Sequence, residues 1–489
     1  MTPAPGRRPV LIGWSRSCRF DGEPLAAWEH ALRGTGVPPK ALDSLDVVYC
    51  QSWPYDDPAG RLAAAVGADP RRAEYSGIGG TTPLSLLGAA SERILAGEAD
   101  VCAVVTGEAL ATVRRLKKDN ARPQWSHRDP VKRPFPFEAP FHPAEVAHGI
   151  FQAYTTFAMR DVARRAHAGT TVEDHRAAIG RLFAPMTEVA AANPYAWFPT
   201  VRAPAELVGV TPTNRVIAHP YTKLVTAIMD VDQAAAFVVA SEDGADRLGV
   251  HPDRRVYVRG WAEDRDPDYV AENEHLWRSP AMTSALHGAL GRAGLGVDDV
   301  ARFDIYSCFP SSVWFSLDAL ELAEDDSRAP FTVTGGLPYA GGPGSGYAVG
   351  SVAAMAEALV ADPGAVGMVT AVGMHLSKHA AAVLSTDPGE SPGPLVRPAT
   401  GNAAGPVRRP IALEADGPAT VAAYTVHHAG DGSATEALMV CDLAGTDGVR
   451  GYARCTEPDL LAAMEEEEWV GRAVTLRHEG SVNTVIEAA

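Results

Sequence analysis

Short runs of β-branched residues alternate with alanine-rich stretches along the first 388 residues. This pattern is typical of α/β units with buried parallel strands. We expect helices at 84–100 and 350–362. Strands are predicted at 8–15, 45–53, 99–109 and 234–241, and again at 254–263, 301–309, 331–336 and 367–374. Because the two sets are similar in order and length, the chain is predicted to hold an internally duplicated α/β body, with halves at 1–253 and 254–388.

The pattern changes in two places. Between about 110 and 215, a basic, proline-containing loop and two amphipathic helices predict a loop domain inserted in the first half. Residues 389–411 are rich in proline and glycine, which indicates an extended linker. Residues 412–489 then carry four strand-like runs and one short helix near 459–468, as expected for a small β-barrel of the OB type.

Composition narrows the class of protein. The 489 residues include 43 Lys and Arg against 60 Asp and Glu, a formal net charge of −17. Such an acidic surface repels phosphate backbones, so we expect no nucleic-acid partner. The longest apolar stretches are too short to span a bilayer, and the start lacks a signal-peptide core, so a cytoplasmic location without a membrane partner is expected. The six cysteines are far apart, which argues against disulfides and a zinc site.

Several glycine-rich segments, read in order on this duplicated body, resemble the thiolase superfamily. They are HPYTKLVTAIMDVDQAAAFVVAS (219–241), DIYSCFPSS (304–312), FTVTGGLPYAGGPGSGY (331–347) and HLSKHAAAVLSTDP (375–388). The tail segments 452–455 and 470–479 extend the resemblance to actinobacterial thiolase-like proteins, similar to acetyl-CoA acetyltransferases, that carry an additional C-terminal domain. It implies an α/β class chain with a duplicated thiolase fold, layered αβαβα, plus a small β-rich OB-like C-terminal domain.

The sequence departs from the family at all four catalytic elements of thiolases. Gly80 stands at the nucleophilic cysteine, where a helix N-terminus would favour a thiolate. Tyr306 stands at the first position of the NEAF or HDCF turn, and Gly342 replaces the histidine of the GHP motif. Ala371 replaces the acid/base cysteine. Claisen chemistry through an acyl-cysteine is therefore not expected.

Three residues remain as candidates for catalysis. Tyr306 ends a predicted strand, and thiolase-like steroid side-chain aldolases, which act with a small OB-fold partner, have a tyrosine at this motif position. A phenol needs a nearby positive charge or strong hydrogen-bond donors to act as a base. Alternatively, Tyr306 only fills the space left by the missing catalytic side chains. Cys308 could be a replacement nucleophile, although free cysteines are usually buried apolar groups. His375 is the best-placed neutral base, and His379 is the alternative to it. Tyr339 or Tyr347 could supply a second phenol beside that of Tyr306.

A basic segment opens the predicted loop domain. Residues 114–133 contain eight Lys or Arg against two Asp, inside an acidic chain. This segment could simply be a solvated face. By resemblance to thiolases, it could also hold the nucleotide end of coenzyme A. In that case Arg114, Arg115, Lys117 and Lys118 would contact phosphates, and Trp125 would stack on the adenine.

The sequence therefore predicts a thiolase-like protein of acyl or lipid metabolism that binds a CoA thioester as substrate or ligand. No covalently bound cofactor and no metal are expected, and the chain would be a monomer or homodimer. The expected reaction is acyl transfer or retro-aldol C–C cleavage without the standard cysteine, and acyl transfer through Cys308 is a further possibility. The alternative is a catalytically inactive acyl-CoA-binding or scaffold protein.

Overall fold

A computed structural model describes residues 6–131, 141–393 and 407–488. The N-terminal half contains β1 (Pro9–Cys18), α1 (Pro24–Gly34), β2 (Ser44–Val47), α2 (Pro58–Val66), β3 (Arg72–Tyr75), α3 (Thr82–Leu95), β4 (Val101–Ala109), β7 (Asp232–Ser241) and α9 (Glu242–Arg247). The C-terminal half contains β8 (Val256–Arg265), α10 (Pro280–Ala293), β9 (Arg302–Asp304), α11 (Pro310–Leu320), α12 (Tyr347–Ala361), β10 (Val366–Gly373) and β11 (Lys378–Ser385).

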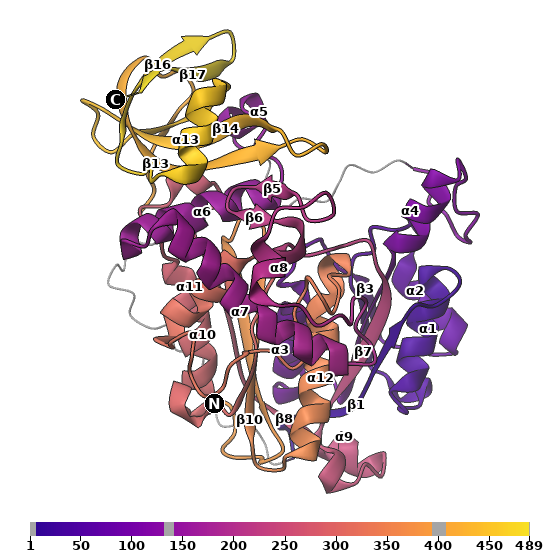
Figure 1. Ribbon diagram of the computed structural model, residues 1–489. Helices are drawn as coiled ribbons and strands as arrows, with labels where there is room; N and C mark the ends of the chain where they lie inside the picture. The colour runs from indigo at the N-terminus through magenta and orange to yellow at the C-terminus, as the bar shows by residue number, and fades with distance from the viewer. Residues whose placement is uncertain (1–5, 132–140, 394–406, 489) are drawn as a thin grey trace.

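Two long helices, α3 and α12, form the centre of the α/β body. In the described part of the chain, nine strands form one sheet in the order β3-β2-β4-β7-β1-β8-β11-β10-β9. Figure 1 shows α3 and α12 between the strands of the two halves, with α1 and α2 outside one half and α10 and α11 outside the other. The layers therefore follow the predicted αβαβα order. The largest apolar core surrounds the central helices, where Leu87, Ile94, Val352 and Met355 are fully buried.

The strand order demonstrates the internal duplication. From the centre of the sheet outward, the N-terminal half runs β1, β7, β4, β2, and the C-terminal half runs β8, β11, β10, β9. Each half therefore places its first strand at the centre and its last strand next to it. The two halves meet through a short antiparallel pairing of β1 with β8, at Val10 with Tyr257 and Leu11 with Val256.

One predicted strand is wrong. Residues 331–336 form a loop, and the expected strand at 301–309 is limited to β9. The reason is Asp304, whose buried carboxylate accepts hydrogen bonds from the amides of Val333 and Thr334 and from the Thr332 hydroxyl. The hydrogen-bond donors of residues 332–334 therefore bond to one side chain instead of to a neighbouring strand.

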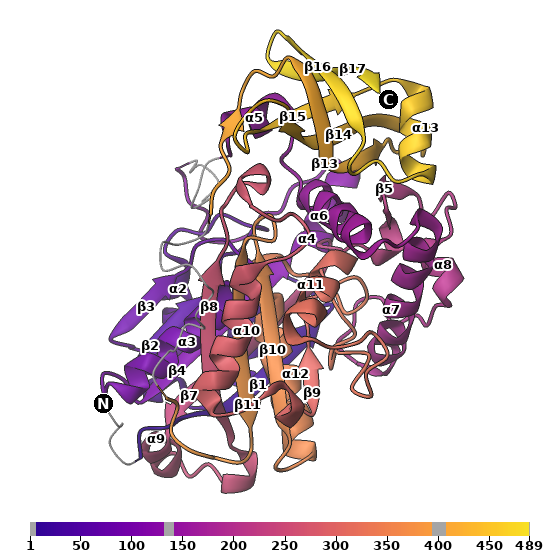
Figure 2. The same cartoon turned by 90° about the vertical axis from the view of Figure 1, so that its left-hand side faces the viewer.

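The predicted loop domain lies partly between the α/β body and the C-terminal barrel (Figure 2). Its elements are α4 (Leu110–Lys118), α5 (Pro143–Ala147), α6 (Ala153–Ala168), α7 (Val172–Ala192), α8 (Pro204–Val208), β5 (Val216–Ala218) and β6 (Tyr221–Thr222). The last of the basic residues, at 132 and 133, lie outside the described residues, as does most of the predicted linker. Among the described residues, no helix has the length and apolar character needed to cross a membrane.

The C-terminal domain is a closed barrel, as predicted. Its elements are β12 (Ile411–Ala412), β13 (Gly417–His428), β14 (Ala434–Leu443), β15 (Arg450–Cys455), α13 (Pro458–Glu466), β16 (Ala473–Glu479) and β17 (Val482–Ala488). Within residues 407–488, five strands close in the order β13-β14-β15-β17-β16 and back to β13. Along the chain, α13 lies between β15 and β16. This is the arrangement expected of an OB-type barrel.

Buried ionic contacts attach the barrel to the loop domain. Arg165 on α6 is fully buried and donates to Glu468 at 3.0 Å and to the Tyr424 hydroxyl at 2.8 Å. Glu465, on α13 of the barrel, lies 3.8 Å from Nδ1 of His219 between β5 and β6. Two residues of the acidic run at 465–468 therefore take part in this interface.

Candidate active site

Two of the turns that replace the thiolase catalytic elements meet at the N-terminal ends of the central helices α3 and α12. The amide of Gly79, just before α3, donates to the Ser345 hydroxyl at 3.0 Å. In the glycine-rich loop that contains Ser345, the amide of Gly342 donates to the carbonyl of Ile228 at 3.0 Å. These bonds link turns that are far apart in the sequence, so the fold brings the predicted positions into one region.

The nucleophile position at Gly80 is occupied by neighbouring atoms. A Cβ atom on residue 80 would lie 2.8 Å from the Tyr306 hydroxyl oxygen and would overlap the carbonyl oxygen of Val372. Val372 follows Ala371, the residue at the second lost cysteine. Three of the four altered elements are therefore in direct contact, and the phenol takes the space that a nucleophile on Gly80 would need.

Gly342 differs from Gly80 in this respect. A Cβ atom at this position would lie 3.4 Å from the Ile228 carbonyl oxygen and 3.5 Å from the Leu337 side chain, which are ordinary contacts. Space for a side chain therefore remains where the thiolase histidine would begin. The missing imidazole at this position is a change of chemistry and not a consequence of crowding.

Tyr306 is held firmly by its backbone, while its hydroxyl is left available. Its amide donates to the Thr370 hydroxyl at 2.9 Å, and its carbonyl accepts from the Ser312 hydroxyl. Among the described residues, the phenol oxygen has no hydrogen-bond partner. Burial, with a smaller contribution from the neighbouring Cys308, raises the pKa of Tyr306 above its ordinary value. The side chain is therefore a neutral phenol that can donate a proton or a hydrogen bond.

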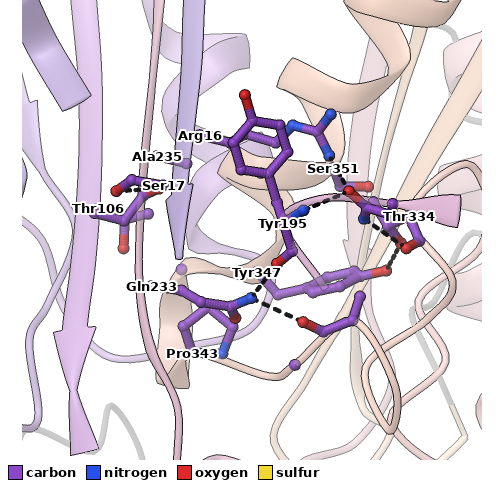
Figure 3. Close-up of a pocket in the computed structure, with 16 residues that line it drawn as sticks. Arg16, Ser17, Thr106, Tyr195, Gln233, Ala235, Thr334, Pro343, Tyr347 and Ser351 are labelled. Carbon is purple, nitrogen blue, oxygen red and sulfur yellow. Dashed lines mark hydrogen bonds between the residues drawn. The ribbon is translucent and has the colours of Figure 1, made fainter. Parts of the chain in front are cut away.

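A second tyrosine supports the first. The Tyr347 ring packs edge-on against Tyr306, with ring centroids 5.5 Å apart. Figure 3 shows its hydroxyl bonded to Thr334, at 2.6 Å, beside a small cavity of about 50 Å³. The same hydroxyl donates to Asp304 at 3.2 Å, and burial raises the pKa of Tyr347 well above its ordinary value. Tyr347 is thus engaged in the network around Asp304, unlike Tyr306.

Cys308 lies in the same turn as Tyr306 and is buried. Burial raises the pKa of its thiol to about 12, although Ser312 and nearby backbone amides lower it somewhat. A thiol with so high a pKa carries almost no thiolate at neutral pH, and the thiolate is the reactive form. Cys308 therefore lacks the activation that a covalent nucleophile needs.

His375 occupies the turn between β10 and β11 and is only 5% exposed. Its Nδ1 lies 2.8 Å from the Thr156 hydroxyl, and its ring packs edge-on against Phe141. Burial lowers the pKa of His375 to about 4, so the imidazole is neutral at pH 7. His379 points elsewhere: its Nε2 contacts Ser279 at 2.9 Å, at the start of α10.

His375 and Tyr306 are connected through shared neighbours rather than by direct contact. Gly373, two residues before His375, lies against the amide of Gly80. On the other side, Phe157 follows the threonine that contacts His375 and packs against Phe309, with centroids 4.7 Å apart. Tyr306 and the turn of His375 therefore both lie against Gly80. Thr156, which contacts His375, was not predicted from the sequence; its only signal there is a polar residue on the buried face of a helix.

The basic residues proposed to hold phosphates lie on α4, which projects from the body at the side away from the barrel (Figure 1). Arg114 forms an ion pair with Asp230. Arg115, Lys117 and Lys118 are exposed, and within the described residues none of them has a carboxylate partner. Three cations are thus free to bind an anion.

Trp125 is half-buried rather than open. Its ring meets Trp53 edge-on, with centroids 5.6 Å apart. The structure thus places it in a packed pair at the margin of the N-terminal core, and adenine stacking stays a prediction. Within the described residues, no three His, Cys, Asp or Glu side chains gather as a metal site would require.

Comparisons with solved structures support the thiolase-like fold. No family model and no curated protein matches the sequence. A monomeric SCP2-thiolase-like protein type 1 from Mycobacterium smegmatis is 30% identical over 99% of this chain and 100% of its own, with a TM-score of 0.85. The Ltp2–ChsH2(DUF35) aldolase structure is 18% identical over 78% of this chain and 98% of its own, at a TM-score of 0.60.

Human mitochondrial 3-ketoacyl-CoA thiolase, solved in complex with CoA, shares the fold at 16% identity and a TM-score of 0.56, over 78% of this chain and 99% of its own. The mycobacterial match extends over both the α/β body and the barrel, because it spans almost the whole of each chain. This protein therefore belongs to the SCP2-thiolase-like proteins of the thiolase superfamily.

Proposed function

We propose that the protein binds an acyl-CoA thioester and acts on it by retro-aldol C–C cleavage or acyl transfer, without a covalent acyl-cysteine. The observation that carries this proposal is the position of the Tyr306 phenol, in the space of the absent nucleophile at Gly80. A neutral phenol there can stabilise negative charge on the thioester oxygen, as an oxyanion hole does. The sequence suggested a phenolate base, and the raised pKa of Tyr306 favours the donor role instead.

In the retro-aldol version, the substrate is a β-hydroxyacyl-CoA. A base takes the proton of the β-hydroxyl group, the Cα–Cβ bond breaks, and its electron pair moves to the thioester as an enolate. Tyr306 donates a hydrogen bond to the enolate oxygen, and His375 is the neutral acceptor for the hydroxyl proton. Protonation at Cα then yields a shorter acyl-CoA and a free aldehyde or ketone, so all atoms are accounted for.

The exposed cations of α4 support binding of the CoA phosphates. Arg115, Lys117 and Lys118 lie at the start of the loop domain and are unpaired within the described residues. A cluster of free cations in a chain with a net charge of −17 favours an anionic ligand. We also propose that the chain is a monomer, like the monomeric SCP2-thiolase-like protein from Mycobacterium smegmatis.

The test combines turnover with intact-protein mass spectrometry. The full chain is incubated with acetyl-CoA, acetoacetyl-CoA and a panel of β-hydroxyacyl-CoA thioesters of increasing size. We expect a carbonyl product and a shortened acyl-CoA from at least one β-hydroxyacyl thioester, with no increase in protein mass. An acyl group mapped to Cys308 would replace the proposal by acyl transfer through that thiol. CoA binding without any turnover would make the protein a non-catalytic acyl-CoA-binding protein.

A further inference from the structure

Helix α6 presents two buried polar residues, one turn apart, to the turn that carries His375. Thr156 and Arg160 are both fully buried. Residues four positions apart lie on the same face of a helix, so both can contact one segment. Thr156 reaches Nδ1 of His375 at 2.8 Å, and Arg160 donates to the carbonyl of Leu376 at 2.7 Å. One helix face therefore holds the histidine and its neighbour together.

The turn is held in a conformation that it would not adopt by itself. Met374 and Leu376, on either side of His375, have φ values of 53° and 61°. Non-glycine residues rarely adopt this left-handed region, and they persist there only where the surroundings enforce it. Arg160 supplies that constraint, because it also donates to the carbonyls of Leu276 and Arg278.

The hydrogen bonds of Thr156 define which nitrogen of His375 carries the proton. A threonine hydroxyl has one proton, and a carbonyl oxygen can only accept. The Thr156 hydroxyl donates to the carbonyl of Ala153 at 3.1 Å and also lies 2.8 Å from Nδ1 of His375. Both bonds can exist together only if Nδ1 carries a hydrogen and donates it to the threonine oxygen.

We propose that Thr156 is a positioning residue that keeps His375 in the Nδ1–H tautomer, so that Nε2 presents a lone pair to the hydroxyl group of the substrate. Among the described residues, Nε2 has no hydrogen-bond partner, as this role requires. The identity of the substrate rests on the proposed function, whereas the tautomer of His375 does not. Fixing the tautomer of a catalytic histidine through its second nitrogen is a general device of acid–base sites.

Electrostatics favour the same arrangement. Burial lowers the pKa of His375 to about 4, so the ring is neutral at pH 7 and one nitrogen must be unprotonated. A neutral imidazole whose Nδ1–H is bound to a hydroxyl can accept a proton only at Nε2. Without Thr156, the ring would be free to exchange between its two neutral tautomers, and only one of them would accept the substrate proton.

The tautomer can be measured by nitrogen NMR on the full chain labelled with 15N-histidine, with the His375 signals assigned by their loss in His375→Gln. We expect His375 in the wild type to show a protonated Nδ1 and an unprotonated Nε2 at pH 7. Thr156→Ser should keep this pattern, because it retains the hydroxyl. Thr156→Val should shift it toward the Nε2–H form or to a mixture of the two.

Thr155→Val is the matched control. Thr155 is the preceding residue on α6, is equally buried, and its hydroxyl lies 2.9 Å from Nε2 of His427 in the barrel. This variant loses the same kind of bond but should leave the His375 tautomer unchanged. A wild-type spectrum with Nε2 protonated, or an unchanged tautomer in Thr156→Val, would overturn the proposal. The wild-type spectrum decides even if the valine variant does not fold.

Activity provides the second measurement. If the wild type turns over a CoA thioester, Thr156→Val should lower kcat by roughly 10-fold or more with little change in KM, and Thr156→Ser should restore most of it. Equal kcat values for Thr156→Val and Thr155→Val would contradict the positioning role. If the wild type turns over no thioester, the proposed function fails, while the NMR result still decides the tautomer.

Discussion

The Tyr306 hydroxyl oxygen lies 2.8 Å from the point that a Cβ atom on residue 80 would occupy, so Gly80 and Tyr306 share one space. The carbonyl oxygen of Val372 closes the same space from β10. Because protein interiors are densely packed, a side chain at one position excludes a side chain at the other. The loss of the nucleophile and the gain of the phenol are therefore one structural change.

Gly80→Ala should destabilise the fold, since the new methyl group would overlap the Val372 carbonyl, and backbone moves less readily than a side chain. Overpacking of this kind costs about 1–3 kcal/mol. Gly77→Ala, in the same turn, is the control, because a Cβ atom at that position meets nothing within 4 Å. Urea unfolding of both variants checks this, and equal stabilities would show that the turn can relax around the methyl group.

Tyr306→Phe should abolish most of the activity and leave the stability nearly unchanged. The hydroxyl has no partner among the described residues, so its removal breaks no internal bond, and we expect a change within about 1 kcal/mol. Loss of the hydrogen-bond donor should lower turnover by roughly 100-fold. Tyr339→Phe removes another buried hydroxyl that lacks a partner, and it should keep normal turnover unless Tyr339 is the second phenol. Full turnover by a normally folded Tyr306→Phe would exclude the phenol from the reaction.

Replacing Arg114, Arg115, Lys117 and Lys118 by serine should weaken CoA binding by more than about tenfold at low salt, and by less at high salt, because salt screens phosphate contacts. Calorimetry at two salt concentrations measures this. Most of the effect should come from Arg115, Lys117 and Lys118, since Arg114 already pairs with Asp230. The comparison is a variant with Arg454→Ser and Arg477→Ser on the barrel. Equal affinities of the two variants would identify α4 as an ordinary solvated face.

The stability contributed at His375 should be lost as the pH falls from about 6.5 to about 4. Burial lowers the pKa of His375 from its ordinary value of 6.5 to about 4, so within this window the unfolded chain binds a proton that the folded chain does not. The free energy of unfolding then decreases by up to about 1.4 kcal/mol for each pH unit. His375→Gln removes this dependence. Urea unfolding at pH 7.5, 6.5 and 5.5 should therefore show the two proteins converging or crossing on acidification, whereas parallel profiles would contradict the burial effect.

Local sequence patterns were sufficient for most of the architecture. Hydrophobic runs predict β1, β4, β7, β8 and β10, because buried strands need continuous apolar side chains on both faces. The four strands and the helix of the tail predict the barrel for the same reason. The strand β11 was not predicted, since its alanine-rich stretch at 380–382 is equally compatible with a helix.

Motif order likewise located Gly80, Tyr306, Gly342 and Ala371, because these positions are defined by neighbouring glycines and strand ends within the sequence itself. Their chemistry required the fold. The sequence by itself contains only a tyrosine and a histidine, whereas burial in the fold raises the pKa of Tyr306 and lowers that of His375 to about 4.

Only the tertiary structure decided which residues act together. The carboxylate of Asp304 turns 331–336 into a loop, and Thr156, more than 200 residues before His375, contacts its ring. No local pattern contains such pairs, because they are set by how α6 packs against the turn between β10 and β11. The sequence determined the strands, the helices and the missing thiolase side chains through local preference and burial, whereas the shared space of Gly80 and Tyr306 and the tautomer of His375 depend on contacts that exist only after the chain has folded.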